Sequence, residues 1–152
     1  MLPYAYHAPA PEVWTPDLED DPESELEAEL CVVRGEEFFI HAIIRLPVLD
    51  GDDDFDWGVW VSLSRDHYER AVDLWDTPGR EDEPPYFGWL TTELPTYARS
   101  TLLLKTSVQT RPVGLRPLVQ LEATDHPLAI EQREGITVAR LEEIAAAVLS
   151  GR

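Results

Sequence analysis

Cysteine is almost absent from this chain of 152 residues, which contains only Cys31. A single cysteine cannot form an intramolecular disulfide, and with four scattered histidines it cannot supply the ligands of a structural zinc site. Because Cys31 lies where a strand is expected to begin, in an acidic part of the chain, we interpret it as a small buried hydrophobic residue, not a nucleophile. We expect no bound metal and no cofactor.

Long hydrophobic runs are also missing. No apolar stretch approaches the roughly 20 residues that a transmembrane helix needs, so a membrane-spanning helix is excluded. Residues 1–11 contain three prolines and no basic residue, a composition unlike that of a secretory signal. We therefore expect a cytoplasmic protein that does not bind membranes.

Basic residues are few, with 12 Lys and Arg against 30 Asp and Glu, a net charge of −18. Residues 1–60 carry sixteen of the acids and only two of the bases. Nucleic-acid binding requires Lys and Arg to neutralise phosphates, so this charge disfavours DNA and RNA as partners. A basic protein partner, simple solubility and a salt-rich cytoplasm remain as explanations of the acidity.

The chain divides into two parts that differ in composition. Residues 1–29, here named the N-terminal segment, are rich in proline and acid, and we expect Tyr4, Tyr6 and Trp14 to dock this segment on the body. Its acidic run, 17–29, is expected to be exposed, with at most one short helix after Pro22. The length of the remainder, 30–152, fits a single domain.

Alternation of apolar and polar residues predicts strands over 30–34, 37–46, 57–63, 101–110 and 118–123. Helical spacing predicts one helix over 65–75, capped by Ser64, and a second over 136–150, ended by Gly151. Residues 86–90 are interpreted only as an aromatic cluster. Together these elements indicate an α+β fold, with an antiparallel sheet and helices packed mainly on one of its faces.

Catalytic motifs are not found. The loop Asp50-Gly-Asp-Asp-Asp54 begins like a calcium-binding loop, but Phe55 and Val61 occupy positions that need glycine and glutamate. Aromatic residues and a few polar groups in the second half form the best candidate site, because ligand pockets combine such groups. A purely structural role, with the tryptophans in the core and the arginines paired with surface acids, is the other interpretation. The candidates are Trp57, Trp60, Trp89, Lys105, Arg111, Arg116, Glu122, Asp125 and His126.

Two of these candidates, Arg111 and Arg116, flank Val113-Gly114 between two predicted strands. Each precedes a proline, which favours extended backbone, while the glycine permits a turn. We therefore expect a rigid hairpin-like loop that holds both guanidinium groups at one end of the sheet.

Several strings resemble a bacterial family, domain of unknown function 2199, over about residues 30–147. They include Trp57-Gly-Val-Trp-Val-Ser-Leu-Ser64, Pro85-Tyr-Phe-Gly-Trp-Leu90, Thr110-Arg-Pro-x-Gly-x-Arg-Pro117 and Leu121-Glu-x-x-Asp-His-Pro-Leu-Ala129. The resemblance implies a bacterial cytoplasmic protein but no activity. Many members begin with a Cys-x-x-Cys-Gly element that resembles half of a zinc knuckle. This chain lacks that element, either naturally or because of a late start codon.

Small size, acidity and the absence of a catalytic motif favour a binding protein over an enzyme. We expect an interaction protein, of the immunity or antitoxin kind, that binds a basic protein partner. The alternative is an enzyme that binds a small anionic ligand in an aromatic pocket with an Arg and Lys anchor, and a homodimer is a third possibility. If the candidate side chains converge in one pocket, the enzyme is favoured; if they are dispersed, the interaction protein is favoured.

Overall fold

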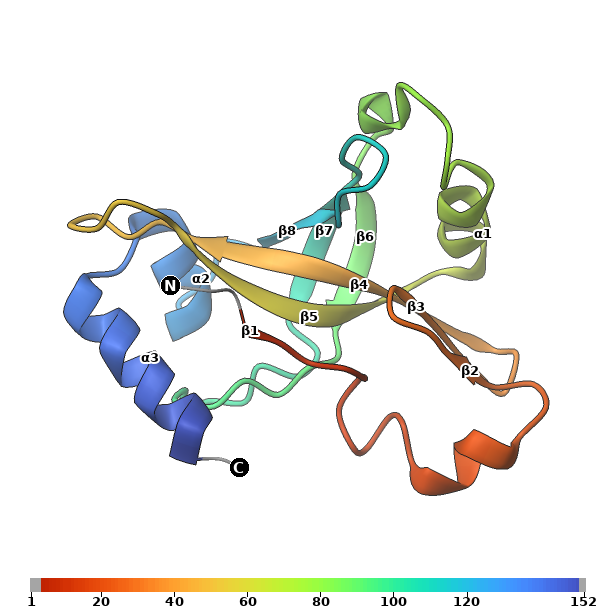
Figure 1. Ribbon diagram of the computed structural model, residues 1–152, viewed down its shortest axis with the longest axis horizontal. Coiled ribbons are helices and arrows are strands. Elements are labelled where there is room, and N and C mark those ends of the chain that lie inside the picture. The colour runs from red at the N-terminus through yellow and green to blue at the C-terminus, as the bar shows by residue number, and fades with distance from the viewer. Residues whose placement is uncertain (1–3, 151–152) are drawn as a thin grey trace.

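A computed structural model of the chain describes residues 4–150, which form a single α+β domain (Figure 1). The strands are β1 (Tyr4–Ala5), β2 (Glu25–Leu26), β3 (Leu30–Val33), β4 (Glu37–Leu46), β5 (Phe55–Leu63), β6 (Tyr86–Leu90), β7 (Lys105–Gln109) and β8 (Leu118–Leu121). The α-helices are α1 (Arg65–Asp73), α2 (Pro127–Glu134) and α3 (Val138–Ser150), and two 3-10 helices, η1 (Pro16–Asp20) and η2 (Arg80–Asp82), complete the set. No helix among these residues is long and apolar enough to cross a membrane.

The sheet is mixed and curls into a five-stranded barrel, so the predicted antiparallel sheet is only partly right. Strands β5, β6, β7, β8 and β4 are neighbours in that order, and β4 also pairs with β5, which closes the ring. Strands β4 and β8 pair in parallel, at Ile43 and Leu118, and β1 and β5 also pair in parallel. The helices do not share one face, since α1 lies at one end of the barrel and α2 and α3 lie at the other (Figure 1).

The close approach of β6 to β5 requires glycine at residue 88. These strands pair only at Val61 with Leu90 and at Ser62 with Trp89. A Cβ atom on Gly88 would lie 2.4 Å from Val61 Cγ1 and 2.7 Å from the Ser62 carbonyl oxygen. No side chain fits at this distance, so Gly88 lets the two strands approach and the barrel close.

The barrel interior is the main hydrophobic core, and its alternating pattern confirms the prediction for β4 and β5. Inward residues alternate along both strands because successive side chains of a strand point to opposite faces. They are Ile40, Ala42, Ile44 and Leu46 of β4 and Trp57, Val59, Val61 and Leu63 of β5, all less than one tenth exposed. Val108 of β7 and Val119 and Leu121 of β8 fill the opposite wall.

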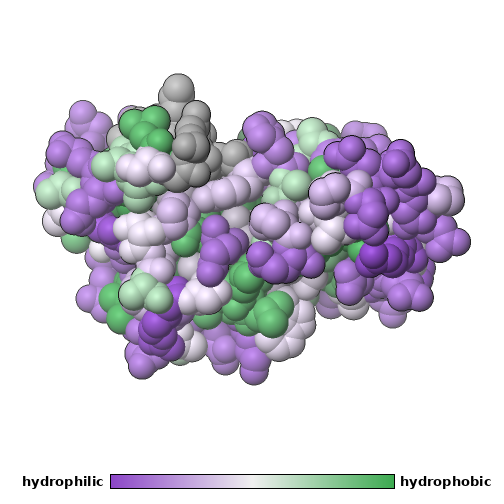
Figure 2. Space-filling view, turned by 90° about the horizontal axis from the view of Figure 1, so that it is seen from below, coloured by the Kyte–Doolittle hydropathy of each residue, from purple (hydrophilic) through white to green (hydrophobic). Residues whose placement is uncertain are grey.

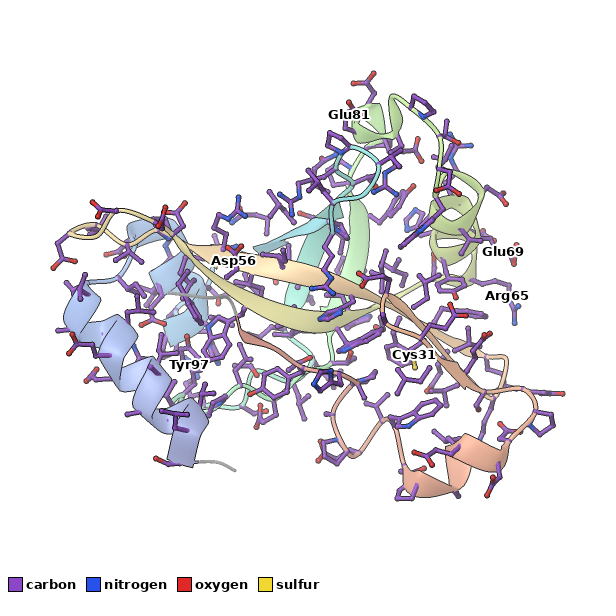
Figure 3. All side chains as sticks on the ribbon, viewed as in Figure 1. Cys31, Asp56, Arg65, Glu69, Glu81 and Tyr97 are labelled. Carbon is purple, nitrogen blue, oxygen red and sulfur yellow. The ribbon has the colours of Figure 1, made fainter. Side chains whose placement is uncertain are left out.

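A second, smaller core lies outside the barrel, beneath the N-terminal segment. It contains Leu18, Cys31, Val33, Phe39 and Trp60, with Tyr6, Val13, Trp14 and Leu26 packed against it. Cys31 lies on the side of β3 that faces the N-terminal segment (Figure 3). Figure 2 shows hydrophilic side chains filling the right-hand end of the molecule, where Figure 1 places η1 and β2.

Three expectations for the helices need correction. The short helix expected after Pro22 is absent from the described residues, and η1 lies before it instead. Ser64 does cap α1, accepting a hydrogen bond from the His67 N–H, but α1 ends at Asp73, two residues early. The helix expected over 136–150 is α3, which begins at Val138, and α2, which Gly135 ends with a φ of 85°, was not expected. Gly151 and Met1–Pro3, and the side chain of Tyr4, lie outside the described part of the chain.

The second half of the sheet also differs from the expectation. Residues 86–90 are a strand, β6, whose side chains alternate between buried and exposed. The strand expected over 101–110 begins only at Lys105, because Leu103 adopts a left-handed φ of 64°, which no regular strand accommodates. Strand β8 likewise ends at Leu121 and not at residue 123.

Candidate functional site

The nine predicted site residues do not converge on one pocket. Trp57 and Trp60 are fully buried, Trp57 in the barrel core and Trp60 in the second core, on opposite faces of β5. Neither side chain is available to a ligand or partner, so both are corrected to core residues. The other seven lie in three separate places.

The outer surface of β6 and β7 brings together Trp89, Lys105 and Glu122. With Phe87 and Leu103 these residues are here named the aromatic face. Lys105 is directly opposite Trp89 in the β6–β7 ladder, and its Nζ lies 5.9 Å from the centre of the Trp89 ring. The Glu122 N–H donates to the Lys105 carbonyl oxygen at 2.9 Å, which fixes Glu122 beside them.

The apolar residues of the aromatic face are exposed to solvent. Phe87 is 48% exposed, Trp89 40% and Leu103 65%. The Phe87 and Trp89 rings meet edge to face, with their centres 5.1 Å apart, so each holds the other in place. Two shallow grooves of about 210 and 230 Å³ flank Lys105 and Glu122 on this surface. The face offers rigid, exposed aromatic side chains beside one base and one acid.

A cleft of about 500 Å³, here named the arginine cleft, receives Arg111 and Arg116. The β7–β8 loop forms one wall, and the segment that joins α1 to η2 lies beside it (Figure 1). Antiparallel pairing of β7 with β8 confirms the expected hairpin. The lining residues are Glu29, Ile43, Trp75, Asp76, Arg80, Arg111, Val113, Gly114, Leu115 and Arg116.

Arg80, which the sequence analysis missed, fixes the wall of this cleft. Its guanidinium is buried and donates to four backbone carbonyl oxygens at 2.7–3.1 Å. These oxygens belong to Trp75, Arg111, Pro112 and Leu115. Arg80 therefore holds the β7–β8 loop against the end of α1 without any carboxylate partner among residues 4–150.

The two predicted arginines of the loop differ in their bonding. Arg116 forms a two-pronged ion pair with Glu29, with N···O distances of 2.7 and 2.9 Å. Arg111 donates through Nε to the Arg116 carbonyl oxygen at 2.6 Å. Its two terminal nitrogens have no hydrogen-bond or ion-pair partner within the described range, 4–150. Burial, and secondly the charge of Arg45, lower the pKa of Arg111.

Asp125 and His126 lie apart from both surfaces. Asp125 forms an exposed ion pair with Arg99 at 3.1 Å. His126 is buried and caps α2: its Nδ1 accepts a hydrogen bond from the Leu128 N–H at 3.0 Å. Its Nε2 therefore carries the proton and lies 3.2 and 3.1 Å from the carbonyl oxygens of Arg99 and Ser100. His126 is structural, and its predicted role in a pocket is wrong.

The remaining reactive groups are held in unreactive states. Burial raises the pKa of Cys31 to about 12, so the thiol stays protonated. Burial lowers the pKa of His41, whose ring stacks on Trp60 with centres 4.7 Å apart and whose Nδ1 lies 3.0 Å from the Ala28 carbonyl oxygen. No group of three His, Cys, Asp or Glu able to hold a metal ion occurs in the described part of the chain. Cys31 and His41 are therefore held by the fold, and neither lies in the aromatic face or the arginine cleft.

Comparison of the chain with known proteins finds a match to one protein family. The model of a family described as an uncharacterized protein conserved in bacteria, DUF2199, matches residues 1–136. No curated protein and no solved structure shows a match. The match covers the barrel and the N-terminal segment, and it confirms the resemblance seen in the sequence.

Proposed function

Since the chain belongs to the DUF2199 family of bacterial proteins, whose description names no activity, we propose a function from its surface: a non-catalytic module that binds a basic protein partner. The aromatic face is the proposed docking surface. The observation that carries the proposal is the pair Phe87 and Trp89, exposed side by side on one strand. We also propose a cytoplasmic location.

Aromatic residues that lie exposed on a free protein often contribute much of the binding energy of a protein interface. Tryptophan is enriched among interface hot spots because it buries a large area with few rotatable bonds. Phe87 and Trp89 lie on a strand of the barrel, so their positions are set before binding, and little conformational entropy is lost when a partner covers them. Leu103 extends the apolar area at the end of the face.

The negative net charge of the protein favours a partner of positive net charge. At −18, two copies of this chain repel each other, which disfavours a homodimer through the aromatic face. A partner with an excess of Lys and Arg is instead attracted over long range, and its cations can stack on Trp89 or pair with Glu122. A basic toxin paired with an acidic immunity protein or antitoxin has this complementarity.

Site-specific cross-linking tests the proposal. A photo-activatable residue is placed at Phe87 and, as a control, at Leu149, an equally apolar residue that is 68% exposed on α3. In native host cells, position 87 is expected to capture a discrete polypeptide of net positive charge, and position 149 is not. Capture of a second copy of this chain, or equal capture from both positions, would contradict the proposal.

Affinity of the purified pair provides the quantitative check. Trp89→Ala should weaken binding at least about tenfold, as expected for an interface hot spot. Leu149→Ala should leave the affinity within about twofold. Added salt should slow association of the parent pair, because attraction between opposite charges is screened.

A further inference from the structure

The arginine cleft carries a local charge opposite to that of the whole protein. Three bases line it, Arg80, Arg111 and Arg116, against two acids, Glu29 and Asp76. The local balance of 3 − 2 is +1, in a chain whose net charge is −18. Such a reversal allows the cleft to accept a negative ion despite the overall charge of the molecule.

Among the three arginines of the cleft, Arg111 has both terminal nitrogens without a hydrogen-bond or ion-pair partner in the described range, 4–150. Arg80 uses its guanidinium on four carbonyl oxygens, and Arg116 uses two nitrogens on Glu29. The nearby carboxylate of Asp56 is held by Arg45 in a two-pronged pair at 2.8 and 3.0 Å. Arg111 thus keeps a planar pair of N–H donors while its Nε is fixed to the loop.

The loop that carries Arg111 is held rigidly. Arg80 binds three of its carbonyl groups, the Leu115 N–H donates to the Pro112 carbonyl oxygen at 3.1 Å, and Gly114 turns with a φ of 93°. The guanidinium therefore needs little reorganisation on binding.

We propose that the arginine cleft binds a small organic monocarboxylate, with its carboxylate on the terminal nitrogens of Arg111 and its apolar body against Trp75 and Leu115. The apolar lining, which also includes Ile43 and Val113, favours a ligand with an apolar body over a bare inorganic ion. The overall negative field favours one charge over two, which disfavours phosphate. A volume of about 500 Å³ is within the range of small-molecule sites.

Titration with benzoate, followed through backbone amide and tryptophan indole NMR signals, tests this site. Saturable shifts are expected at residues 111–116 and at the Trp75 indole. Benzamide, which has the same shape without the charge, should bind at least about tenfold more weakly, and phosphate should bind more weakly than benzoate. Sodium chloride at matched ionic strength serves as the blank.

Variants of Arg111 test whether its guanidinium binds the carboxylate of benzoate. Arg111→Gln should weaken benzoate at least about tenfold, Arg111→Lys should have an intermediate effect, and Arg99→Gln, which removes an exposed arginine elsewhere, should change the affinity less than about twofold. If Arg111→Gln does not fold, Arg111→Lys still separates charge from fork geometry. The proposal is overturned if benzoate binding does not saturate below about 50 mM, or if the shifts are centred elsewhere. It is also overturned if phosphate binds more tightly than benzoate, or if Arg111→Gln and Arg111→Lys both keep full affinity for benzoate. None of these results depends on the aromatic face.

Discussion

Arg116 joins the β7–β8 loop to Glu29 of the N-terminal segment, 87 positions earlier in the chain, through two hydrogen bonds of 2.7 and 2.9 Å. Asp125, an acid closer to Arg116 in sequence, pairs with Arg99 instead. The Arg116–Glu29 pair therefore ties the acidic segment to the wall of the arginine cleft. It couples two parts of the chain that local sequence patterns treat separately.

Breaking this pair should cost little free energy of unfolding. The side chains of Arg116 and Glu29 are 38% and 31% exposed, so water screens their attraction. We expect Arg116→Ala and Glu29→Ala each to cost about 0.5–1 kcal/mol, with a coupling energy below about 1 kcal/mol in a double-mutant cycle. Urea denaturation of the four proteins measures it, and a coupling of several kcal/mol would show that the pair is effectively buried.

Arg80 should be far more important to stability than any paired arginine. Replacement by Met keeps the packing volume but leaves four carbonyl oxygens without their charged donor. Since each hydrogen bond to a charged group contributes about 1.5–3 kcal/mol and some carbonyls regain water, we expect Arg80→Met to cost about 2–4 kcal/mol. Arg70→Met, which removes an exposed guanidinium paired with Glu83, is the matched control. Equal losses in both variants would contradict this role.

His126 should act on stability through its cap on α2. His126→Ala removes the acceptor for the Leu128 N–H and should cost about 1–3 kcal/mol in urea denaturation. His126→Asn supplies another capping acceptor and should recover part of this loss. Asp125→Ala breaks only an exposed ion pair and should change stability by less than about 0.5 kcal/mol. If Asn is no better than Ala, the cap is not the source of the stability.

Local patterns predicted the longest strands well and the barrel not at all. Along β4 and β5, the residues that fill the barrel core alternate as the sequence indicated, because period two is a property of each strand alone. The outward residues Phe39, His41 and Trp60 are buried as well, because the N-terminal segment covers that face. Closure depends on the parallel contact between Ile43 and Leu118, which lie far apart in sequence and carry no local signal. Helix α2 was not predicted, although the pair His126-Pro127 places a proline at the first helical position after a capping residue.

The candidate site was predicted in part for the same reason. Exposure of Trp89 and burial of Trp57 and Trp60 follow from the tertiary packing of β5 and β6, which no local pattern reveals. The loop of Arg111 was predictable because its prolines and glycine restrict the backbone locally. The role of Arg80 was not, because nothing in a Pro- and Gly-rich loop marks an arginine whose partners are distant carbonyl groups.

Cys31 should report whether the N-terminal segment stays docked. Its side chain is 1% exposed beneath that segment, and burial raises its pKa to about 12, so a thiol reagent at pH 8 should react at least about 100-fold more slowly than with unfolded protein. Trp14→Ala, which removes part of the cover, should accelerate the reaction while the barrel stays folded by circular dichroism. Fast labelling of the parent protein would show that the segment opens readily.

His41 should make docking of the same segment sensitive to acid. Burial lowers the pKa of its ring from the ordinary 6.5, the Ala28 carbonyl opposes this shift, and the charges of Arg116 and His7 add to it against that of Glu29. The unfolded chain therefore takes up a proton near pH 6.5, whereas the folded chain resists it. Stability supplied by the neutral ring is present above pH 6.5 and is lost as the pH falls below it toward the lowered pKa.

Substitution of the ring isolates this effect. His41→Phe keeps an aromatic ring against Trp60 but cannot take up a proton, so its stability should decline less than that of the parent between pH 7 and pH 5. Urea midpoints at several pH values measure the difference, with His67→Phe, at a half-buried position on α1, as the control for removal of any histidine. Hydrogen exchange should place the acid-induced opening at β2, β3 and the N-terminal segment, because His41 bonds to the carbonyl oxygens of Ala28 and Glu29 in that segment. Parallel stability curves for the parent and His41→Phe would show that the buried ring does not sense pH.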